Sequence, residues 1–542
     1  MATLQKYTKM VIHCAITIYL VLILGVMPFY NQEGYSHIGT DKAYFFNKYT
    51  VNMGKIIVLP VVLYLILLAV QLRGSLWKKL RSHLSVTDLF AAGYALALVL
   101  SYYCSAYKDV DLFSFNALWG FTGWYMGFWP EMFLILIYFF VSKLWKPRMW
   151  MLYMAFAVSW AVFLLGYLNR FGVNPLNMTF TGSAFISTIG NINWYCGYLV
   201  SVFFAGTVFL WQGNAKKPLK NILLALYVIM GFGTLVTNGS DSGLVTLSAV
   251  LLVMFCLSVD DNHRMLMFWL EVSLLGIVCV VTWVIRLLAP DSMNYDSRVT
   301  DLLSTGWLPI VMTFVSYIIL VWVYRSVRKG TYSEKIAKTF ATAVALIVTS
   351  LIVLLPIMIT LNTAWPGILG PLSKYSIFTF SAEWGSNRGA TWSIGWKCFA
   401  EQNILHKLTG IGPDCMGAYL YNGASQELSA LTKEIFGGSQ LTNAHCEWLT
   451  ILVNIGILGL ISFGGMILTG IWRFLRGAGH NIVTCACGFC LFAYTVNNIF
   501  SFQQSMSVAT IFAIFGIGGA FYGKTVEKNG KEIEGTENEQ PG

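Results

Sequence analysis

The sequence predicts an all-α polytopic membrane protein with about 12 to 14 transmembrane helices and one large outer loop. The 542-residue chain is 56% hydrophobic and only 11% charged, with a mean hydropathy of +0.64. Globular proteins usually carry about 25% charged residues. The apolar residues gather in runs of roughly 18–25 residues, the length that a helix needs to cross a ~30 Å hydrocarbon core.

About fourteen such runs can be delimited along the chain. The first follows Lys6 and Lys9 and ends without a small-residue cleavage pattern, so we expect a retained helix and not a signal peptide. The last two are separated only by Phe502 and its neighbours, which leaves a re-entrant pair as an alternative. The runs cover approximately residues 10–29, 52–72, 87–106, 119–141, 150–167, 194–211, 221–237, 243–260, 265–287, 307–325, 339–361, 446–471, 483–501 and 503–522.

The basic residues predict the orientation. With a cytoplasmic N-terminus, 23 of the 35 lysines and arginines fall on the cytoplasmic side, as the positive-inside rule requires. The net charge of +10 is then a topological signal. This charge does not indicate nucleic-acid binding, because no soluble segment carries a basic stripe with interleaved aromatic residues. The cytoplasmic positions are the N-terminus, loops 73–83, 143–148, 216–220 and 325–338, Arg264, Arg473, Arg476 and the C-terminal tail.

This orientation divides the chain into four parts. Residues 1–361 form a transmembrane bundle, 362–443 an extracytoplasmic loop domain, and 444–523 the C-terminal transmembrane helices. Residues 524–542 are polar, carry five glutamates and lack apolar periodicity. We therefore expect them to be a disordered cytoplasmic tail.

Most of the eleven cysteines lie inside the apolar runs, where they behave as small apolar residues. Cys485, Cys487 and Cys490 sit in an apolar run that contains no histidine or carboxylate partner, so a closed zinc site is not predicted there. Cys398, Cys415 and Cys446 lie on or near the outer side, and the sequence leaves their pairing open.

The outer loop contains a predicted amphipathic helix between Arg388 and Leu408. Trp392, Trp396, Phe399 and Leu405 recur near helical spacing, which suits a helix lying on the membrane with its tryptophans at headgroup depth. The segment Gly410-Ile-Gly-Pro-Asp414 that follows is a predicted turn. We favour a plain connector over a phosphate cradle, because two glycines alone are a weak signal for an anion-binding nest.

His445 is the first candidate catalytic residue. It lies in Asn443-Ala-His-Cys-Glu-Trp448, directly before an apolar run. With Asn443 as the N-cap, His445 falls in the first turn of a membrane helix. A helix N-terminus disfavours imidazolium, so the ring stays neutral and able to accept a proton. The alternative is an interfacial histidine that only caps or packs.

Arg388 is the second candidate, in Gly385-Ser-Asn-Arg-Gly389 on the outer side. A guanidinium presents a planar fork that matches phosphate oxygens, which lysine cannot reproduce. The alternative is an arginine that anchors the helix to lipid headgroups.

Further polar groups gather at the outer interface. Asn191 and Asn193 open the sixth apolar run, where amides hold a sugar or cap a helix. Ser240 and Asp241 lie in a tight turn, and for Asp241 a turn role is favoured over a ligand role. Carboxylates within or near the ends of spans, such as Glu131 and Glu271, are functional candidates by position. Neither a metal nor another cofactor is predicted.

Together, these motifs resemble the O-antigen ligase and O-antigen polymerase superfamily over about the C-terminal two-thirds of the chain. The resemblance implies a fold like that of GT-C glycosyltransferases, in the plasma (inner) membrane of a bacterium, with a polyprenyl-pyrophosphate-linked glycan as donor. It implies a glycan, lipid or protein as acceptor. The matching segments, in order, are 190–194, 237–243, Asn387-Arg388 with Trp392, 410–412, 443–449 and 456–459.

By this resemblance, Arg388 corresponds to an essential loop arginine and His445 to an essential histidine of the family. Two positions depart from the family pattern. Asp241 follows Ser240 where family ligases usually carry a second arginine, and Cys446 follows the histidine where asparagine is frequent. The sequence therefore departs from a two-arginine clamp on the pyrophosphate. The donor- and acceptor-binding residues that the resemblance implies are Asn191, Asn193, Ser240, Asp241, Trp392 and Glu447.

The implied chemistry is metal-independent, inverting glycan transfer. Arg388 stabilises the leaving pyrophosphate, and His445 removes the proton from an acceptor hydroxyl that attacks the anomeric carbon. The sequence does not separate a polymerase from a ligase.

The alternative from another class is a transporter or flippase for a lipid-linked or small polar substrate. Transporters place broken helices and charges near the bilayer midplane. Here the polar residues collect at the outer interface beside a loop of about 80 residues, and loops of this length usually carry function. The enzyme is therefore the favoured prediction.

Overall fold

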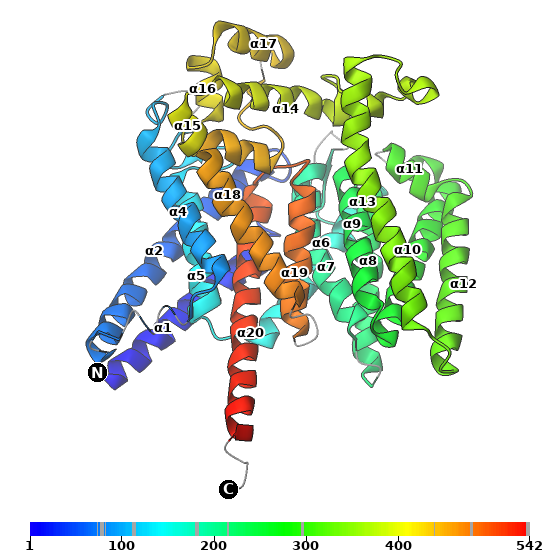
Figure 1. Ribbon diagram of the computed structural model, residues 1–542, viewed down its shortest axis with the longest axis horizontal. Coiled ribbons are helices and arrows are strands. Elements are labelled where there is room, and N and C mark those ends of the chain that lie inside the picture. The colour runs from blue at the N-terminus through cyan, green and yellow to red at the C-terminus, as the bar shows by residue number, and fades with distance from the viewer. Residues whose placement is uncertain are drawn as a thin grey trace.

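The protein is almost entirely helical (Figure 1). The computed structural model describes residues 1–537 except 73, 76–77, 79–80, 82, 111–114, 179–183, 214–215, 294–296, 438 and 477–480. Within these residues, 12 helices are long and apolar enough to cross a membrane. The predicted all-α, polytopic class is therefore confirmed. Parts of the basic loop 73–83 and the end of the tail, 538–542, lie outside the described residues.

The 12 candidate spans are distributed along the chain from Ala2 to Gly523. Two of them, α2 and α13, contain a proline within the helix, at Pro60 and Pro356. The spans are α1 with η1 (Ala2–Val26), α2 (Ile38–Leu72), α4 (Val86–Cys104), α6 (Met149–Arg170), α7 (Ile192–Trp211), α8 (Pro218–Thr237), α9 (Asp241–Ser258), α10 (Asn262–Leu288), α12 (Leu308–Arg328), α13 (Glu334–Ala364), α18 (Glu447–Arg476) and the first part of α20 (Ser505–Gly523).

Two predicted runs form shorter helices than expected. Run 119–141 becomes the 17-residue α5 (Phe128–Leu144), because residues 115–121 form a hairpin of strands β1 (Phe115–Asn116) and β2 (Gly120–Phe121) instead. Run 483–501 becomes the 16-residue α19 (Ile482–Asn497). At 1.5 Å per residue, each is about 25 Å long. Residues 498–504 join α19 to α20, and Figure 1 shows α18, α19 and α20 side by side.

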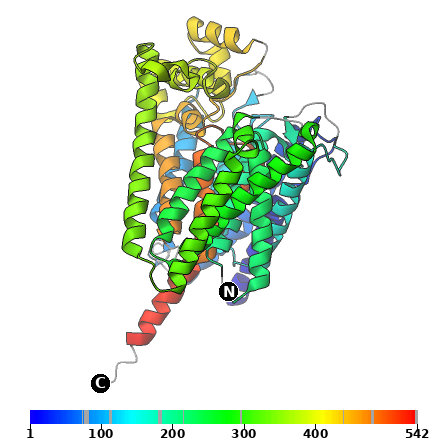
Figure 2. The same ribbon diagram turned by 90° about the vertical axis from the view of Figure 1, so that its right-hand side faces the viewer.

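The core of the bundle forms around α7. This helix buries 89% of its most apolar 18-residue window, whereas α13 buries only 6%. A helix that is apolar all round belongs in the centre of a bundle, and α7 packs against α8, α19 and α20. Helix α13 makes its contacts with α9 and the 3₁₀ turn η4 (Ser376–Phe378) and stands at the edge of the molecule (Figure 2). Near the ends of α6 and α7, strands β3 (Phe185–Ile186) and β4 (Gly190–Asn191) form a second hairpin.

The loop domain lies at one end of the bundle, and both termini lie at the other end (Figures 1 and 2). It has its own small core, which includes Ile394, Cys398, Ile411 and Leu420. Its helices, with the short connecting helices before them, are η2 (Pro290–Ser292), α11 (Arg298–Ser304), η3 (Gly370–Lys374), α14 (Trp384–Glu401), α15 (Ile404–Thr409), α16 (Met416–Asn422) and α17 (Gln426–Phe436).

The predicted amphipathic helix 388–408 is in fact two helices, α14 and α15. They break at Gln402 because Asn403 caps α15, with its side chain accepting a hydrogen bond from the His406 backbone N–H. Helix α14 buries Ile394 and Cys398 in the core of the loop domain and leaves Trp396 59% exposed. The face of α14 that is buried in the loop domain is therefore opposite Trp396, which we expected to lie in the apolar stripe.

All eleven cysteines are free thiols in the structure. Cys398 and Cys415 are both buried in the core of the loop domain without pairing. At the C-terminus, α20 continues as helix to Glu537, beyond Lys524, where the sequence predicted that order ends. Glutamate and lysine, which are frequent there, are good helix formers.

The arrangement generates a test of orientation. Lys374 and Lys433 belong to the loop domain, whereas Lys329 follows α12 at the start of the connection to α13. All three are exposed. We expect single cysteines at positions 374 and 433, in a background without the native exposed thiols, to react with a membrane-impermeant maleimide in intact cells. A cysteine at position 329 should react only after the membrane is permeabilised. The reverse pattern would place the loop domain in the cytoplasm.

Candidate functional site

Residues from four distant segments meet where the loop domain joins the bundle. Asn193 lies in the first turn of α7, Asp241 begins α9, Arg388 lies near the start of α14, and His445 immediately precedes α18. Arg388 acts electrostatically on both Asp241 and His445. The structure thus brings together the two residues predicted to be catalytic and two of the predicted binding residues, Asn193 and Asp241.

Arg388 is held by two backbone carbonyls. Its Nε donates to the Phe500 carbonyl at 2.7 Å, and its Nη1 donates to the Gly385 carbonyl at 2.8 Å. Gly385, Ser386 and Asn387 all have positive φ, of 60°, 60° and 67°. This left-handed turn is strained for Ser386 and Asn387, and it brings the Gly385 carbonyl back to the guanidinium. The Arg388 side chain is half-buried.

Burial lowers the pKa of the Arg388 guanidinium, and the nearby Asp241 carboxylate opposes that shift. Arginine starts from a pKa above 12, so Arg388 remains a cation at neutral pH. It is a fixed positive charge whose counter-charge, Asp241, is exposed. An anionic ligand such as pyrophosphate is the complement of such a group.

His445 does not lie in a helical turn, contrary to the prediction. Helix α18 begins at Glu447, and His445 has φ 49°, in the left-handed region. Asn443 does not cap the helix; its Oδ1 accepts the His445 backbone N–H at 3.0 Å, in an Asx turn. The physical reason is that the first N–H of α18, that of Glu447, is satisfied by the Asn498 and Ser501 carbonyls at 3.0 and 2.8 Å, so the helix needs no side-chain cap there.

The His445 ring is exposed at the site and packs edge-on against Phe502, with ring centroids 5.2 Å apart. Desolvation by the surrounding protein and then the Arg388 charge lower the pKa of His445 to about 4. A lowered pKa means that the imidazole is neutral at pH 7. Desolvation and the Arg388 charge thus lower the pKa of His445, whereas the sequence predicted that a helix N-terminus would do so.

The connection 498–504 organises the site, and sequence reasoning missed it. Its backbone carbonyls accept from Arg388 and Glu447, its Phe500 ring stacks on Trp392 at 6.0 Å, and its Phe502 ring contacts His445. A signal was present: Asn497-Asn498 and Gln503-Gln504 are polar pairs that flank this connection between two apolar runs. Polar residues at the mouth of two buried helices indicate a functional position more strongly than a simple hairpin does.

Some of the predicted binding residues are accessible, whereas the side chains of others already make structural contacts. Asn193 and Asp241 are exposed, and Asn193 Oδ1 accepts from the Ser240 hydroxyl at 2.9 Å. Asn191 uses its side-chain oxygen to cap α7, accepting from the Asn193 backbone N–H at 2.9 Å. Asn191 is therefore a capping residue, and its free side-chain group is the amide nitrogen.

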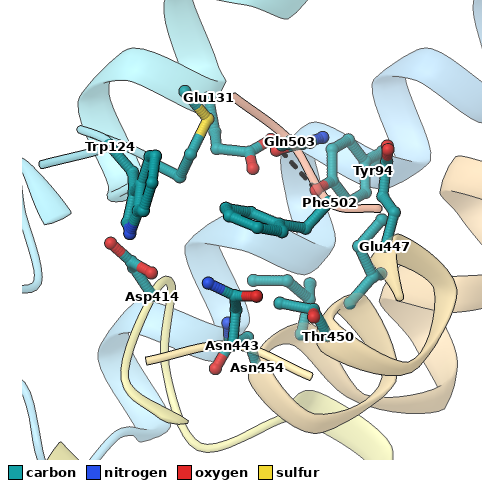
Figure 3. Close-up of a pocket in the computed structure, with 13 residues that line it drawn as sticks. Tyr94, Trp124, Glu131, Asp414, Asn443, Glu447, Thr450, Asn454, Phe502 and Gln503 are labelled. Carbon is teal, nitrogen blue, oxygen red and sulfur yellow. Dashed lines mark hydrogen bonds between the residues drawn. The ribbon is translucent and has the colours of Figure 1, made fainter. Parts of the chain in front are cut away.

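Trp392 and Glu447 face the interior. Trp392 lies between Trp384 and Phe500, at ring distances of 5.5 and 6.0 Å. Glu447 is 2% exposed and its carboxylate accepts from the Asn498 side chain. Glu447 lines a cavity beside the site, together with Glu131 and Asp414 (Figure 3).

The Gly410–Asp414 turn is a connector that locks the loop domain onto α18. The N–H groups of Ile411 and Gly412 donate to the Val453 and Asn454 carbonyls at 3.2 and 3.0 Å, so they do not cradle a phosphate. These carbonyls are available because α18 kinks at Gly456, which has φ 74°. The turn thereby fixes the start of α18, and with it His445, against the loop domain.

Among the residues that the structure describes, no group of three or more His, Cys, Asp or Glu side chains is arranged to hold a metal ion. Comparison of the chain with protein-family models gives no match, and comparison with curated proteins gives none. The functional assignment therefore rests on the residues and their geometry.

The lock between the turn and α18 predicts a sharp loss of stability for Gly410→Ala. Gly410 has φ 81° and ψ 174°, a conformation restricted to glycine, and a Cβ there would overlap the Asn454 carbonyl. Such strain alone costs about 1–3 kcal/mol, and the overlap adds to it. We expect a clearly lower thermal unfolding temperature in detergent than for wild type.

Gly437→Ala is the matched control, because Gly437 also has positive φ but has open space around it. We expect its cost to be confined to backbone strain of about 1–3 kcal/mol, because its φ of 55° and ψ of −119° also disfavour a side chain. Equal unfolding temperatures for the two variants would mean that the Gly410–Asn454 contact does not hold the domain in place.

Proposed function

We propose that this protein is a membrane glycosyltransferase that polymerises or ligates glycan from a polyprenyl-pyrophosphate-linked donor. The observation that carries the proposal is the pairing of a fixed cation, Arg388, with a neutral and accessible histidine, His445, at one end of a membrane bundle. A leaving pyrophosphate needs the first group, and an attacking hydroxyl needs the second.

Arg388 binds the pyrophosphate in this mechanism. Two of its donors are fixed to the Phe500 and Gly385 carbonyls, so the guanidinium does not reorganise when charge develops on the leaving oxygen. Preorganised donors of this kind stabilise a transition state more than flexible ones do. In the proposed mechanism, the remaining N–H groups of Nη1 and Nη2 donate to the pyrophosphate.

His445 is the general base. In the free protein, Arg388 helps to keep its pKa at about 4, which makes it a weak base. A bound pyrophosphate would neutralise the Arg388 charge and so raise the pKa of His445 toward its ordinary value. Donor binding and base strength are thereby coupled. The acceptor oxygen attacks the anomeric carbon as the carbon–oxygen bond to the pyrophosphate breaks, with inversion.

Asp241 distinguishes this site from a two-arginine clamp. Its carboxylate lies near Arg388 and is exposed, as is Asn193. A carboxylate and an amide accept and donate hydrogen bonds to sugar hydroxyls, so we assign them to the sugar groups of donor or acceptor. Arg388 then carries the pyrophosphate charge alone, without metal or nucleotide. The acceptor is a glycan, a lipid or a protein.

In the proposed setting, the protein belongs to the bacterial plasma membrane, with a GT-C-like arrangement, cytoplasmic termini and an extracytoplasmic site. A transporter or flippase would need its polar groups along a path through the bundle. The accessible groups Asn193, Asp241, Arg388 and His445 instead lie together where the loop domain meets the helices, which favours an enzyme.

His445→Ala should abolish glycan transfer while leaving expression and membrane insertion unchanged. Loss of a general base costs about 10²–10⁴-fold in turnover. The assay is chain growth or transfer from purified polyprenyl-pyrophosphate glycan in nanodiscs, with His37→Ala, which alters an exposed histidine outside the site, as control. In the donor-free protein, an NMR titration of labelled histidine should place His445 near pH 4. A variant with near-normal turnover would leave His445 as a packing residue.

Arg388→Lys separates phosphate binding from headgroup anchoring. A headgroup anchor tolerates lysine, because both side chains extend to the interface. Lysine cannot hold the Phe500 and Gly385 carbonyls and also offer a planar fork. We therefore expect turnover to fall about 10²-fold or more for both Arg388→Lys and Arg388→Ala, with weaker donor binding. Lys397→Ala, an exposed cation on the same helix, should keep normal activity. Recovery of most activity with lysine would remove Arg388 from the mechanism.

A further inference from the structure

A small cavity lies beside the His445–Arg388 site. Three carboxylates line it from three elements: Glu131 from α5, Asp414 from the turn after α15, and Glu447 from the start of α18 (Figure 3). About 30 Å³ is open to the centre of a water molecule, which is room for about two waters and not for a sugar. Phe502 lies between these carboxylates.

The cavity concentrates negative charge without a compensating cation. Glu131, Asp414 and Glu447 are 6%, 8% and 2% exposed. No lysine or arginine lines the cavity, and none of the ion pairs in the described residues includes these carboxylates. Burying isolated ionised carboxylates costs several kcal/mol or more for each, so such groups take up protons or hold water.

One buried acceptor in the cavity lacks a donor. Asn454 Oδ1 is buried and has no hydrogen-bond partner, and Asn454 lines the cavity. Asn454 is 5% exposed, so bulk water does not satisfy it. An orphaned acceptor beside a space for about two waters calls for a bound water as its donor. The cavity chemistry is therefore that of water and protons.

The cavity is next to the base. Asn443 and Glu447, each two residues from His445 in the chain, line it. The Phe502 ring contacts His445 and also lines the cavity. A proton that leaves His445 finds here a set of buried acceptors whose hydrogen bonds extend further, since Glu131 accepts from the Tyr94 hydroxyl at 3.0 Å.

We propose that this cavity is a hydrated proton acceptor for His445, an inference that rests on the glycan-transfer function proposed above. The acceptor O–H bond breaks, its proton moves to His445, and its electron pair forms the new glycosidic bond. The bond between the anomeric carbon and the pyrophosphate oxygen breaks at the same time, and its electron pair leaves on the pyrophosphate. His445 then passes the proton through water to the carboxylates, and the cavity releases it to bulk solution before the next turnover. Glu447 is the nearest carboxylate to His445 in the chain and is a positioning and proton-accepting residue.

The titration of Asp414 agrees with this role. Burial raises the pKa of Asp414 to about 7, and the hydrogen bond from the Phe121 N–H opposes the shift. The carboxyl therefore gains a proton as pH falls through about 7, in the range where a working enzyme exchanges protons. The other titratable groups at or around the cavity are Tyr94, Glu131, Glu447 and Tyr494.

Chemical rescue tests the proposal. We expect Glu447→Gln to lower turnover at least about 10-fold, within the range for acid–base groups. Because His445 is exposed, a small diffusible base such as imidazole should then restore the rate of the variant in proportion to its concentration, without affecting wild type. Asp414→Asn, from another element, should behave alike. Glu271→Gln is the matched control, since Glu271 is a fully buried carboxylate on α10 outside the cavity. Unchanged turnover in both cavity variants, or loss without rescue, would overturn the proposal.

An infrared measurement separates this proposal from the proposed function, because it needs no glycan. Exposed carboxylates titrate near pH 4, so protons taken up between about pH 8 and about pH 6 belong to buried ones. We expect carboxylic acid absorption to increase over this range in wild type and Glu271→Gln, and to increase less in Asp414→Asn. Equal increases in all three would contradict a proton-accepting cavity, whether or not the protein transfers glycan.

Discussion

The candidate site depends on the backbone carbonyls of one short connection, residues 498–502. The Phe500 carbonyl holds the Arg388 guanidinium at 2.7 Å, and the Asn498 and Ser501 carbonyls hold the first N–H of α18, directly after His445. A helix N-terminus and a buried guanidinium both need acceptors, and this connection supplies them from the mouth of α19 and α20. The loop domain and the bundle therefore meet at fixed positions, and the cation and the base keep their spacing because one segment holds both.

The sequence was sufficient for the class of fold and for the residues that meet, because long apolar runs have one stable solution in a membrane. It was not sufficient for local backbone geometry. His445 was expected in a helical turn, yet carbonyls from residues about 50 positions later satisfy the start of α18 and release Asn443 to form an Asx turn. Run 119–141 was shortened by a hairpin. Both outcomes depend on contacts distant in sequence, which periodicity and capping signals do not contain.

The basicity of His445 depends on the charge of Arg388, and donor binding would change that charge. Without a donor, Arg388 faces Asp241 and keeps His445 neutral but weakly basic. The pyrophosphate of a donor would compete with Asp241 for Arg388, and by cancelling the Arg388 charge would strengthen the base. A second arginine at position 241 would hold the donor more tightly but would also lower the basicity of His445 further. In the proposed mechanism, Asp241 therefore gives weaker donor binding than an arginine would. It also gives a larger increase in the basicity of His445 when the donor binds.

The buried carboxylates beside the site lower the stability of the protein, and this cost favours a functional role for them. Three buried acidic side chains without a cation are a less stable arrangement than apolar residues of similar size would be. In the proposed reaction, His445 takes up the acceptor proton and must release it before the next turnover. Water held by Glu131, Asp414 and Glu447 next to Phe502 meets that need at the point where His445 is otherwise surrounded by Arg388 and aromatic rings. The buried carboxylates of the cavity and the weakly basic His445 therefore belong to one proposed proton path.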